Sequence, residues 1–355
     1  MRARTTLIRP ALVLALVVSL AGATAGSTAA APVDGPDTSS FQKLSAPIAP
    51  VPATEGADAP ADESVARATA LSSPAFPDTE WATFRDLNLT RINYAGVNPV
   101  IRHGALDSLA TTWVNSQSNS TDPQLDDNIE SKVPAGSLGG VQLMYSYVGG
   151  TTAEMQEFLD WITVENLRYD AIDPELTDSG IGIAATATGL YAYYIIVGYT
   201  HSTPASDELP LYRFYKPSAG THFYSTSAGE RNTVIGFPEY RYEGLVAYIK
   251  GPQATSTTVP LQDLNRFFLA SAGTHFYTSA PAEYQAVLTY PQYSLDGVAG
   301  RVAAAPGTGL SAMHRFFRPA SGTHFYSANP AEVEAVKGLP GYTYEGTAFF
   351  LRVAS

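Results

Sequence analysis

Residues 211–351 contain the same sequence unit three times, and no other feature restricts the fold of this chain as strongly. Every unit combines an Arg-Phe-aromatic stretch, a Gly-Thr-His-Phe-Tyr stretch, a later Glu and a closing acid–Gly pair. In all three units the Arg precedes the His by nine residues, the His precedes the Glu by eight, and the Glu precedes the closing Gly by 14. Identical spacing over three units is the signature of a repeat architecture, in which each copy forms one supersecondary unit.

The repeat predicts an all-β domain over residues 208–355. Each unit, at about 211–250, 264–302 and 313–352, has the pattern of two strands around a turn, a short helical turn and two further strands. Three units are too few for a propeller, which uses about four to eight blades. A closed barrel with pseudo-threefold symmetry accommodates the twelve expected strands and leaves no open sheet edge, so we predict a β-trefoil-like fold.

Nine repeated side chains are the candidate ligand-binding residues. In each unit an Arg and a His supply hydrogen-bond donors near a Tyr, which a sugar ring can stack against. Two alternatives stay open: the three His share one metal ion on the pseudo-axis, or the Arg, His and acid form an internal network that specifies the fold. We favour the internal network. The nine candidates are Arg213, His222, Tyr224, Arg266, His275, Tyr277, Arg315, His324 and Tyr326.

The first 31 residues predict export from the cell. Three Arg within residues 2–9 precede an apolar run at 11–21 and a stretch of small residues, the pattern of a secretory signal peptide over 1–31. Residues 32–73, rich in Pro, Ala, Ser and acidic residues, have the composition of a disordered linker. No second apolar stretch is long enough to span a bilayer, so we expect no membrane anchor and predict a secreted, extracellular protein.

Composition restricts the source and the partners. The chain has no cysteine, whereas extracellular domains of eukaryotes usually carry disulfides, so a bacterial source is favoured. The net charge is −12, of which residues 74–200 carry −11, while residues 201–355 are neutral. Phosphate binding needs clustered Lys and Arg, so nucleic acid is excluded as a partner. The pattern leaves the oligomeric state open.

Residues 74–200 predict an α+β domain. Apolar residues at helical spacing indicate three helices, and two apolar stretches around Thr188 and Gly189 indicate a β-hairpin. Helices that precede a terminal hairpin favour an α-β-α sandwich, with a sheet between layers of helix. The predicted helices cover residues 83–94, 104–116 and 151–168, and the predicted strands cover 180–185 and 190–199.

About residues 85–199 resemble a bacterial CAP domain (cysteine-rich secretory protein, antigen 5, pathogenesis-related 1). Asn-Leu-Thr-Arg at 88–91, with Gly-Val-Asn-Pro-Val at 96–100, is similar to the first helix of that family and the turn after it. Trp161 and the stretch 173–182, which ends in Gly-Ile-Gly, are similar to its last helix and the following strand. The resemblance implies an α-β-α fold with a cleft in which two His and two Glu can hold a divalent metal.

The residues that the family uses for that metal are missing. Leu167 stands where the late His is expected, and Asn119 and Ser120 lie near the place of the early His. The family's Gly-Glu-Asn stretch is matched by Gly140-Val141-Gln142, which has no carboxylate. We therefore predict no metal, no cofactor and no catalytic residue. The remaining carboxylates have the pattern of a solvated acidic surface, with a weak calcium site or an acid/base pair as alternatives. They are Glu154, Glu157, Asp160, Glu165 and Asp170, with Asp126, Asp127 and Glu130.

The three units resemble a repeat of unknown function in bacterial secreted proteins, of the DUF5648 type, found as a tail on secreted hydrolases and CAP proteins. The resemblance implies an accessory role in binding a surface or a glycan. We therefore predict a secreted, non-catalytic CAP-domain protein whose repeat tail binds cell-wall or host glycan. The alternative is a secreted hydrolase of cell wall, protein or polysaccharide that the tail targets. Lipid capture by residues 143–147 is a third hypothesis, and we favour a core strand there instead.

Overall fold

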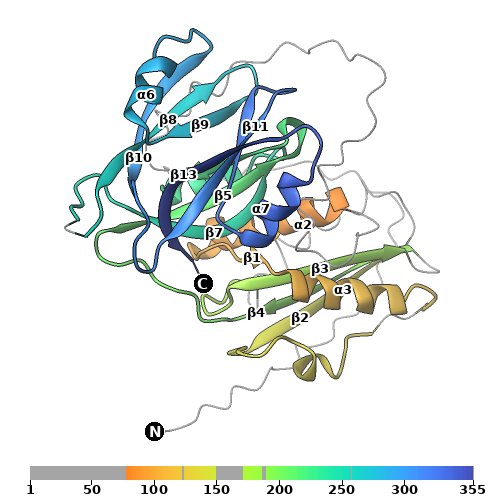
Figure 1. Ribbon diagram of the computed structural model, residues 1–355. Helices are drawn as coiled ribbons and strands as arrows, with labels where there is room; N and C mark the ends of the chain where they lie inside the picture. Colours follow the sequence, from red (N-terminus) through yellow and green to blue (C-terminus); the bar gives the residue numbers. More distant parts are fainter. Residues whose placement is uncertain (1–76, 122–123, 149–170, 186–188, 257, 355) are drawn as a thin grey trace, which may run out of the picture.

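The computed structural model describes residues 77–121, 124–148, 171–185, 189–256 and 258–354 (Figure 1). The predicted signal peptide, the linker, the helix over 151–168 and the carboxylates between 154 and 170 lie outside these residues. No helix in the described ranges is long and apolar enough to cross a membrane.

A four-stranded sheet in the order β1-β3-β4-β2 forms the centre of the N-terminal region. β1 runs parallel to β3, and the other neighbouring strands are antiparallel. We call this sheet and its helices the α/β region. Its elements are α2 (Pro77–Thr90), a π-helical turn (Arg91–Ala95), β1 (Ile101–Arg102), α3 (Gly104–Ser116), a 3-10 turn (Ile129–Ser131), β2 (Gly140–Val148), β3 (Asp178–Ala185) and β4 (Gly189–Val197).

Helices pack on both faces of this sheet, so β4 is buried on both sides. Alternate residues of a strand point to opposite faces. Tyr193 and Ile195 belong to the core under α3, whereas Tyr194 and Ile196 belong to the core under α2. The continuous apolar run that we read as a strand therefore has a physical reason, since neither face of β4 contacts water.

Two glycines of β3 let α3 lie directly on the sheet. A Cβ atom at Gly180 would lie 2.1 Å from the backbone carbonyl carbon of Leu106, and one at Gly182 would lie 2.6 Å from that of Ala110. Only glycine leaves room for so close a contact between two backbones. The Gly-Ile-Gly stretch is thus a packing requirement of the helix above it.

Two local predictions for this region are confirmed, those of the second helix and of the β-hairpin, whereas the first helix has other bounds than the predicted 83–94. The helix over 104–116 has the predicted bounds, with His103 as its N-cap, and the two strands form the predicted antiparallel hairpin. The first helix starts at Pro77, earlier than predicted. Asp78 and Glu80 lie in its first turn, where acidic residues stabilise a helix, and these polar residues add nothing to an apolar periodicity.

The C-terminal region contains three units with the same order of elements: a hairpin, a short helix and a long strand. Unit 1 has β5 (Glu208–Lys216), a 3-10 turn (Pro217–Ala219), β6 (Thr221–Ser225), α5 (Ala228–Ile235) and β7 (Arg241–Lys250). Unit 2 has β8 (Leu261–Leu269), β9 (Thr274–Thr278), α6 (Pro281–Val287) and β10 (Tyr293–Ala303). Unit 3 has β11 (Ser311–Arg318), β12 (Thr323–Ser327), α7 (Pro330–Lys337) and β13 (Thr343–Val353).

Each described unit has three strands, so the prediction of four is wrong. The acid–Gly pair that we read as a break between two strands is a β-bulge within one long strand. In β7, Arg213 pairs with Gly244 and Phe214 with Tyr242, which leaves Glu243 without a partner in the register. Gly244 has φ +105°, a conformation that favours glycine at a bulge. The other two units repeat this shift.

The predicted closed, β-trefoil-like barrel is also wrong, because each unit contributes three strands to one nine-stranded sheet that does not close into a barrel. The long strands pair with one another only near their carboxyl ends, at Arg301 with Lys250, Ala303 with Phe350, and Val353 with Ala247. On the other side of the central core, β6, β9 and β12 lie next to one another and are joined by hydrogen bonds from tyrosine side chains to backbone carbonyls. An all-β arrangement of the C-terminal strands is thus confirmed, without barrel closure.

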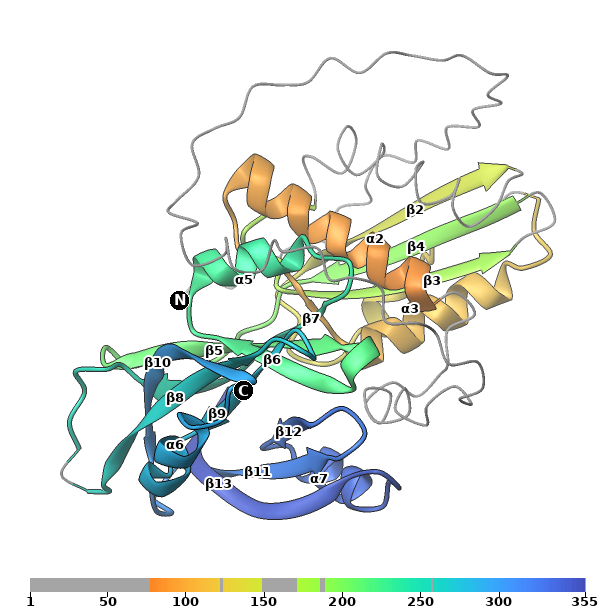
Figure 2. The ribbon, with the colours of Figure 1, turned by 90° about the horizontal axis from the view of Figure 1, so that it is seen from above.

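The α/β region packs against unit 1, so the two regions share one apolar core. Phe84 and Leu87 of α2 belong to the same cluster of buried residues as Phe214 and Phe223 of unit 1. Figure 2 shows α2 lying alongside α5. The core that unit 1 would otherwise expose is therefore covered by α2.

Candidate functional site

The bulged carboxylate of each unit lies between the repeated Arg and the repeated His. In unit 1, Glu243 lies 2.7 Å from Nε of Arg213 and 2.9 Å from Nε2 of His222. Burial alone would raise the pKa of Glu243, but the charges of Arg213 and His222 outweigh it and lower that pKa to about 2. The equivalent pairs are Arg266–Asp296 at 2.7 Å, His275–Asp296 at 3.2 Å, Arg315–Glu345 at 2.7 Å and His324–Glu345 at 3.5 Å.

The same arginines join each unit to its neighbour. The Arg of one unit reaches the Glu in the first turn of the neighbouring unit's helix, and the three contacts close a ring. They are Arg213–Glu332 at 2.8 Å, Arg266–Glu230 at 2.7 Å and Arg315–Glu283 at 2.8 Å. Each arginine side chain is only 17% exposed, so its hydrogen-bonding capacity is directed inward.

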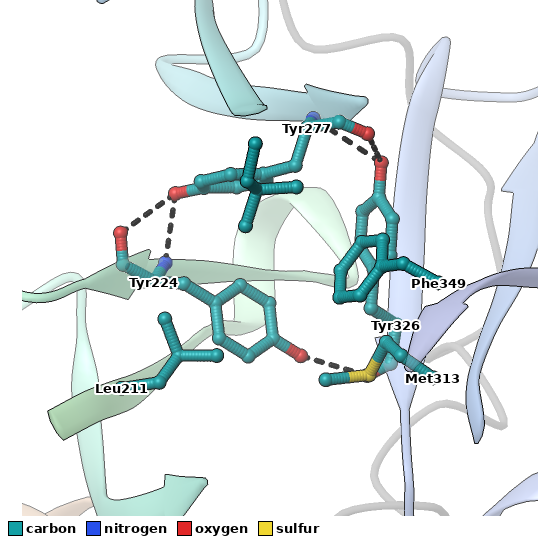
Figure 3. Close-up of a pocket in the computed structure, with 7 residues that line it drawn as sticks. Leu211, Tyr224, Tyr277, Met313, Tyr326 and Phe349 are labelled. Carbon is teal, nitrogen blue, oxygen red and sulfur yellow. Dashed lines mark hydrogen bonds between the residues drawn. The ribbon is translucent and has the colours of Figure 1, made fainter. Parts of the chain in front are cut away.

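The three repeated tyrosines form a second ring on the inside (Figure 3). The hydroxyl of Tyr224 donates to the carbonyl of Tyr326 at 2.7 Å, Tyr326 donates to Tyr277 at 2.6 Å, and Tyr277 donates to Tyr224 at 2.7 Å. The cavity among them, lined also by Leu211, Met313 and other apolar side chains, has a volume of about 10 Å³. This volume suits at most one water molecule and excludes a sugar.

The three histidines pack against the phenylalanine of a neighbouring unit. The ring centroids are 4.7 Å apart for His222 and Phe325, and the pairs His275–Phe223 and His324–Phe276 follow at 5.0 and 4.7 Å. Burial lowers the pKa of His275, and it lowers that of His324 to about 4. These two imidazoles are therefore neutral at pH 7.

The nine candidate residues thus lie in two closed networks. The structure brings each Arg and His together on one carboxylate. Each Tyr is the cross-strand partner of the Arg of its unit, and its hydroxyl bonds within the central core. No group of three metal-ligating side chains occurs among the described residues. Ligand binding by these nine residues stays a prediction, and all of their described polar contacts serve the joints between strands and units.

A groove between α2 and unit 1 is the larger opening, with a volume of about 390 Å³. Trp81 and Tyr240 line it together with charged side chains, and Arg241 lies over the Trp81 ring at 5.7 Å while pairing with Asp78 at 2.8 Å. The lining residues are Asp78, Trp81, Ala82, Arg85, Pro217, Ser218, Pro238, Glu239, Tyr240 and Arg241. The sequence analysis did not find this site because its two walls lie more than 130 residues apart in the chain.

A buried aspartate and a half-buried histidine form a second candidate. Nε2 of His201 lies 2.6 Å from Oδ2 of Asp178, and the hydroxyl of Thr177 donates to the same oxygen at 2.6 Å. The Asp178 side chain is 1% exposed and that of His201 is 35% exposed. His201 lies one residue beyond the predicted α+β domain at 74–200, so the sequence did not indicate a pair with Asp178.

Breaking the ring of ion pairs is expected to destabilise the protein. Glu332 is 8% exposed and holds Arg213 of unit 1, whereas Glu334 on the same helix is 72% exposed and pairs only with Lys337. Glu332→Ala leaves a buried arginine without one partner and should lower the free energy of unfolding by about 3–5 kcal/mol. Glu334→Ala should lower it by less than about 1 kcal/mol. Equal losses in urea unfolding would contradict a structural role of the ring.

The buried histidines make stability depend on pH. The folded chain binds a proton at His324 only near pH 4, whereas the ordinary value is 6.5, so protonation favours the unfolded state as the pH falls below 6.5. Between pH 6.5 and pH 5 this site should cost about 2 kcal/mol of folding free energy. Urea unfolding at pH 7 and pH 5 should show a smaller loss for His324→Gln than for the parent chain. An equal loss in both chains would contradict the assignment.

Comparison with known proteins recognises part of the chain. No curated protein matches it. No match to the CAP family is found, so that resemblance stays a prediction. A family model described as a domain of unknown function, DUF5648, matches twice, over residues 183–264 and 263–354. Residues 183–354 are therefore similar to the DUF5648 family. The first match includes the end of β3, β4 and unit 1, and the second match includes units 2 and 3.

Proposed function

We propose that this chain is a secreted, non-catalytic bacterial protein that binds a glycan of a cell wall or host surface in the groove between α2 and unit 1. Its α/β region is of CAP type in this proposal. The three units form the rigid body that carries one wall of the groove. The groove itself, with its paired aromatic and charged side chains, is the observation on which the proposal rests.

The chemistry of the groove suits a sugar. Its volume of about 390 Å³ lies within the range of about 300–1,000 Å³ that is usual for small-molecule sites. Trp81 and Tyr240 offer apolar ring surface, while Arg85 and Glu239 offer donors and acceptors for hydroxyl groups. Tyr240 is held in place because its hydroxyl donates to the carbonyl of Gly273 in unit 2 at 2.7 Å.

The buried motif residues support the CAP assignment of the α/β region. Arg91 is 1% exposed, and its guanidinium donates to the carbonyls of Asn98 and Leu176, both at 2.9 Å. The amide of Asn88 bonds to the backbone of Val100 in both directions. The two parts of the resemblance, at 88–100 and 173–182, are thus joined by hydrogen bonds at the end of α2.

Removing the Trp81 ring should weaken binding. We expect the full chain to be retained on at least one of insoluble peptidoglycan, chitin, β-glucan or mannan, and Trp81→Ala to reduce the affinity about tenfold, which corresponds to about 1.4 kcal/mol. Trp113→Ala is the matched control, because Trp113 is also partly buried but belongs to the core under α3. Thermal melts of both variants serve as the control for folding. No retention on any polymer, or equal losses in both variants, would refute glycan binding in this groove.

The pair of Asp178 and His201 favours a second candidate function, a secreted hydrolase. A carboxylate that fixes one imidazole nitrogen leaves the other to act as a general base toward a water molecule or a hydroxyl group. His201 is exposed enough for a substrate to reach it. In this case the three units serve to target the enzyme.

Zymograms decide between the two functions. For a hydrolase, the full chain clears gels of cell walls or casein, with or without Ca²⁺, and His201→Gln removes the clearing because it removes the base. His314→Gln, a change at a histidine of unit 3, should leave it unaltered. If the parent chain clears neither substrate, or if His201→Gln clears as well as the parent, Asp178 and His201 do not form a catalytic pair.

A further inference from the structure

The three units present equivalent outer faces. Each face comprises the end of the short helix, the turn after it and the first half of the long strand. Because the spacing from Arg to closing Gly is the same in all units, four positions correspond one to one. In unit 1 they are Ile235, Phe237, Tyr242 and Leu245; in unit 2, Leu288, Tyr290, Leu295 and Val298; in unit 3, Lys337, Leu339, Tyr344 and Thr347.

The α/β region covers the face of unit 1. Ile235 is 2% exposed and Tyr242 is 5% exposed, and both belong to the core shared with α2. Ile101 of β1 lies against Gly244 of the bulge. This face of unit 1 therefore binds another part of the protein, and its side chains are apolar because the α/β region packs on them.

The face of unit 2 is also apolar at these four positions, and none of the described residues covers it. Leu288, Tyr290, Leu295 and Val298 are 46%, 47%, 47% and 46% exposed. They are four of the seven large hydrophobic residues that are exposed among those that the structure describes. α6 and β10 lie away from the α/β region in both views (Figures 1 and 2). Clustered apolar exposure of this kind marks an interaction site.

Unit 3 shows how the same face differs when polar side chains cover it. Lys337 stands at the position of Leu288, and its ammonium lies 4.8 Å from the centre of the Tyr344 ring. Nδ1 of His314 lies 2.7 Å from the Tyr344 hydroxyl. Unit 2 has Asn265 at the position of His314 and keeps an apolar residue at all four positions.

The charge on the unit 2 face restricts its occupant. Residues 284–295 include no charged side chain, and the flanking Glu283 and Asp296 are held in ion pairs with Arg315 and Arg266. In a twofold pair the same surface patch of both copies meets, so a patch that carries one sign of charge would repel its counterpart. Because a chain with a net charge of −12 repels its own copies, an uncharged face is the surface on which that repulsion opposes pairing least.

We infer that the unit 2 face binds the unit 2 face of a second copy of this chain, giving a twofold dimer. The α/β region of the second copy cannot occupy it, because the apolar surface of that region already lies on its own unit 1. Among the described residues, the exposed apolar cluster that a second copy offers is the same unit 2 face. The glycan groove lies on α2 and unit 1, so the dimer presents two grooves.

The mass of the full chain in solution tests this inference. Sedimentation equilibrium from about 1 to 100 µM should show a dimer, since interfaces of modest size hold in the micromolar range or tighter. Leu288→Lys introduces the residue that unit 3 has at this position, and it should weaken the dimer at least about tenfold through the repulsion of two facing charges. Leu138→Lys alters an exposed leucine of the α/β region and should leave the dimer intact.

Three results would overturn the inference. The first is a monomeric parent chain up to about 100 µM, well above the micromolar range expected for this interface. The second is a dimer that Leu288→Lys leaves unchanged, which would place the interface elsewhere. The third is equal weakening by Leu138→Lys, which would indicate non-specific apolar association. None of these results depends on glycan binding, which the Trp81 variant tests separately.

Discussion

The position of one carboxylate in each unit determines how the C-terminal region holds together. The bulge at the closing glycine turns the side chain of Glu243, Asp296 or Glu345 toward an arginine and a histidine of the same unit. The arginine, fixed on one side, then reaches the neighbouring helix on the other. Without the bulge, the register would shift by one residue and the acidic side chain would point to the other face of the sheet. The arginine would then have no partner inside its own unit. The repeated polar residues are thus explained by assembly of the units.

Identical interiors leave the exteriors free to differ. The inner residues repeat in all units because each must fit the same neighbour, while the outer positions carry an apolar set in units 1 and 2 and a partly charged set in unit 3. The α/β region uses one of these outer faces, and its contact with unit 1 also creates the groove. We therefore expect ligand binding where the three units differ from one another, at the contact of unit 1 with α2 and Trp81. We do not expect it at the residues that repeat in all units.

Much of the local structure could be predicted from the sequence, and less of the tertiary arrangement. Apolar periodicity located the helix at 104–116 and the hairpin after Asp178, and the fixed spacing located the three units. The spacing could not show whether Glu243-Gly244 ends a strand or bulges within it, because glycine serves both. A strand end at this position gives four strands per unit and a closed barrel, whereas a bulge gives three strands per unit and no closed barrel. The groove could not be predicted from the sequence, because Trp81 and Tyr240 come together only when the α/β region packs against unit 1.

The ring of ion pairs also has a consequence for how the chain folds. Its closing contact joins Arg213 to Glu332, 119 residues further along the chain. Contacts between residues so distant in sequence slow folding, because a long loop must close before the contact contributes. The ring cannot form until the last unit has been synthesised, and a chain that ends after two units would leave Arg213 without Glu332. The C-terminal region should therefore fold as one cooperative body, unlike a linear repeat array, in which single units can be added or lost.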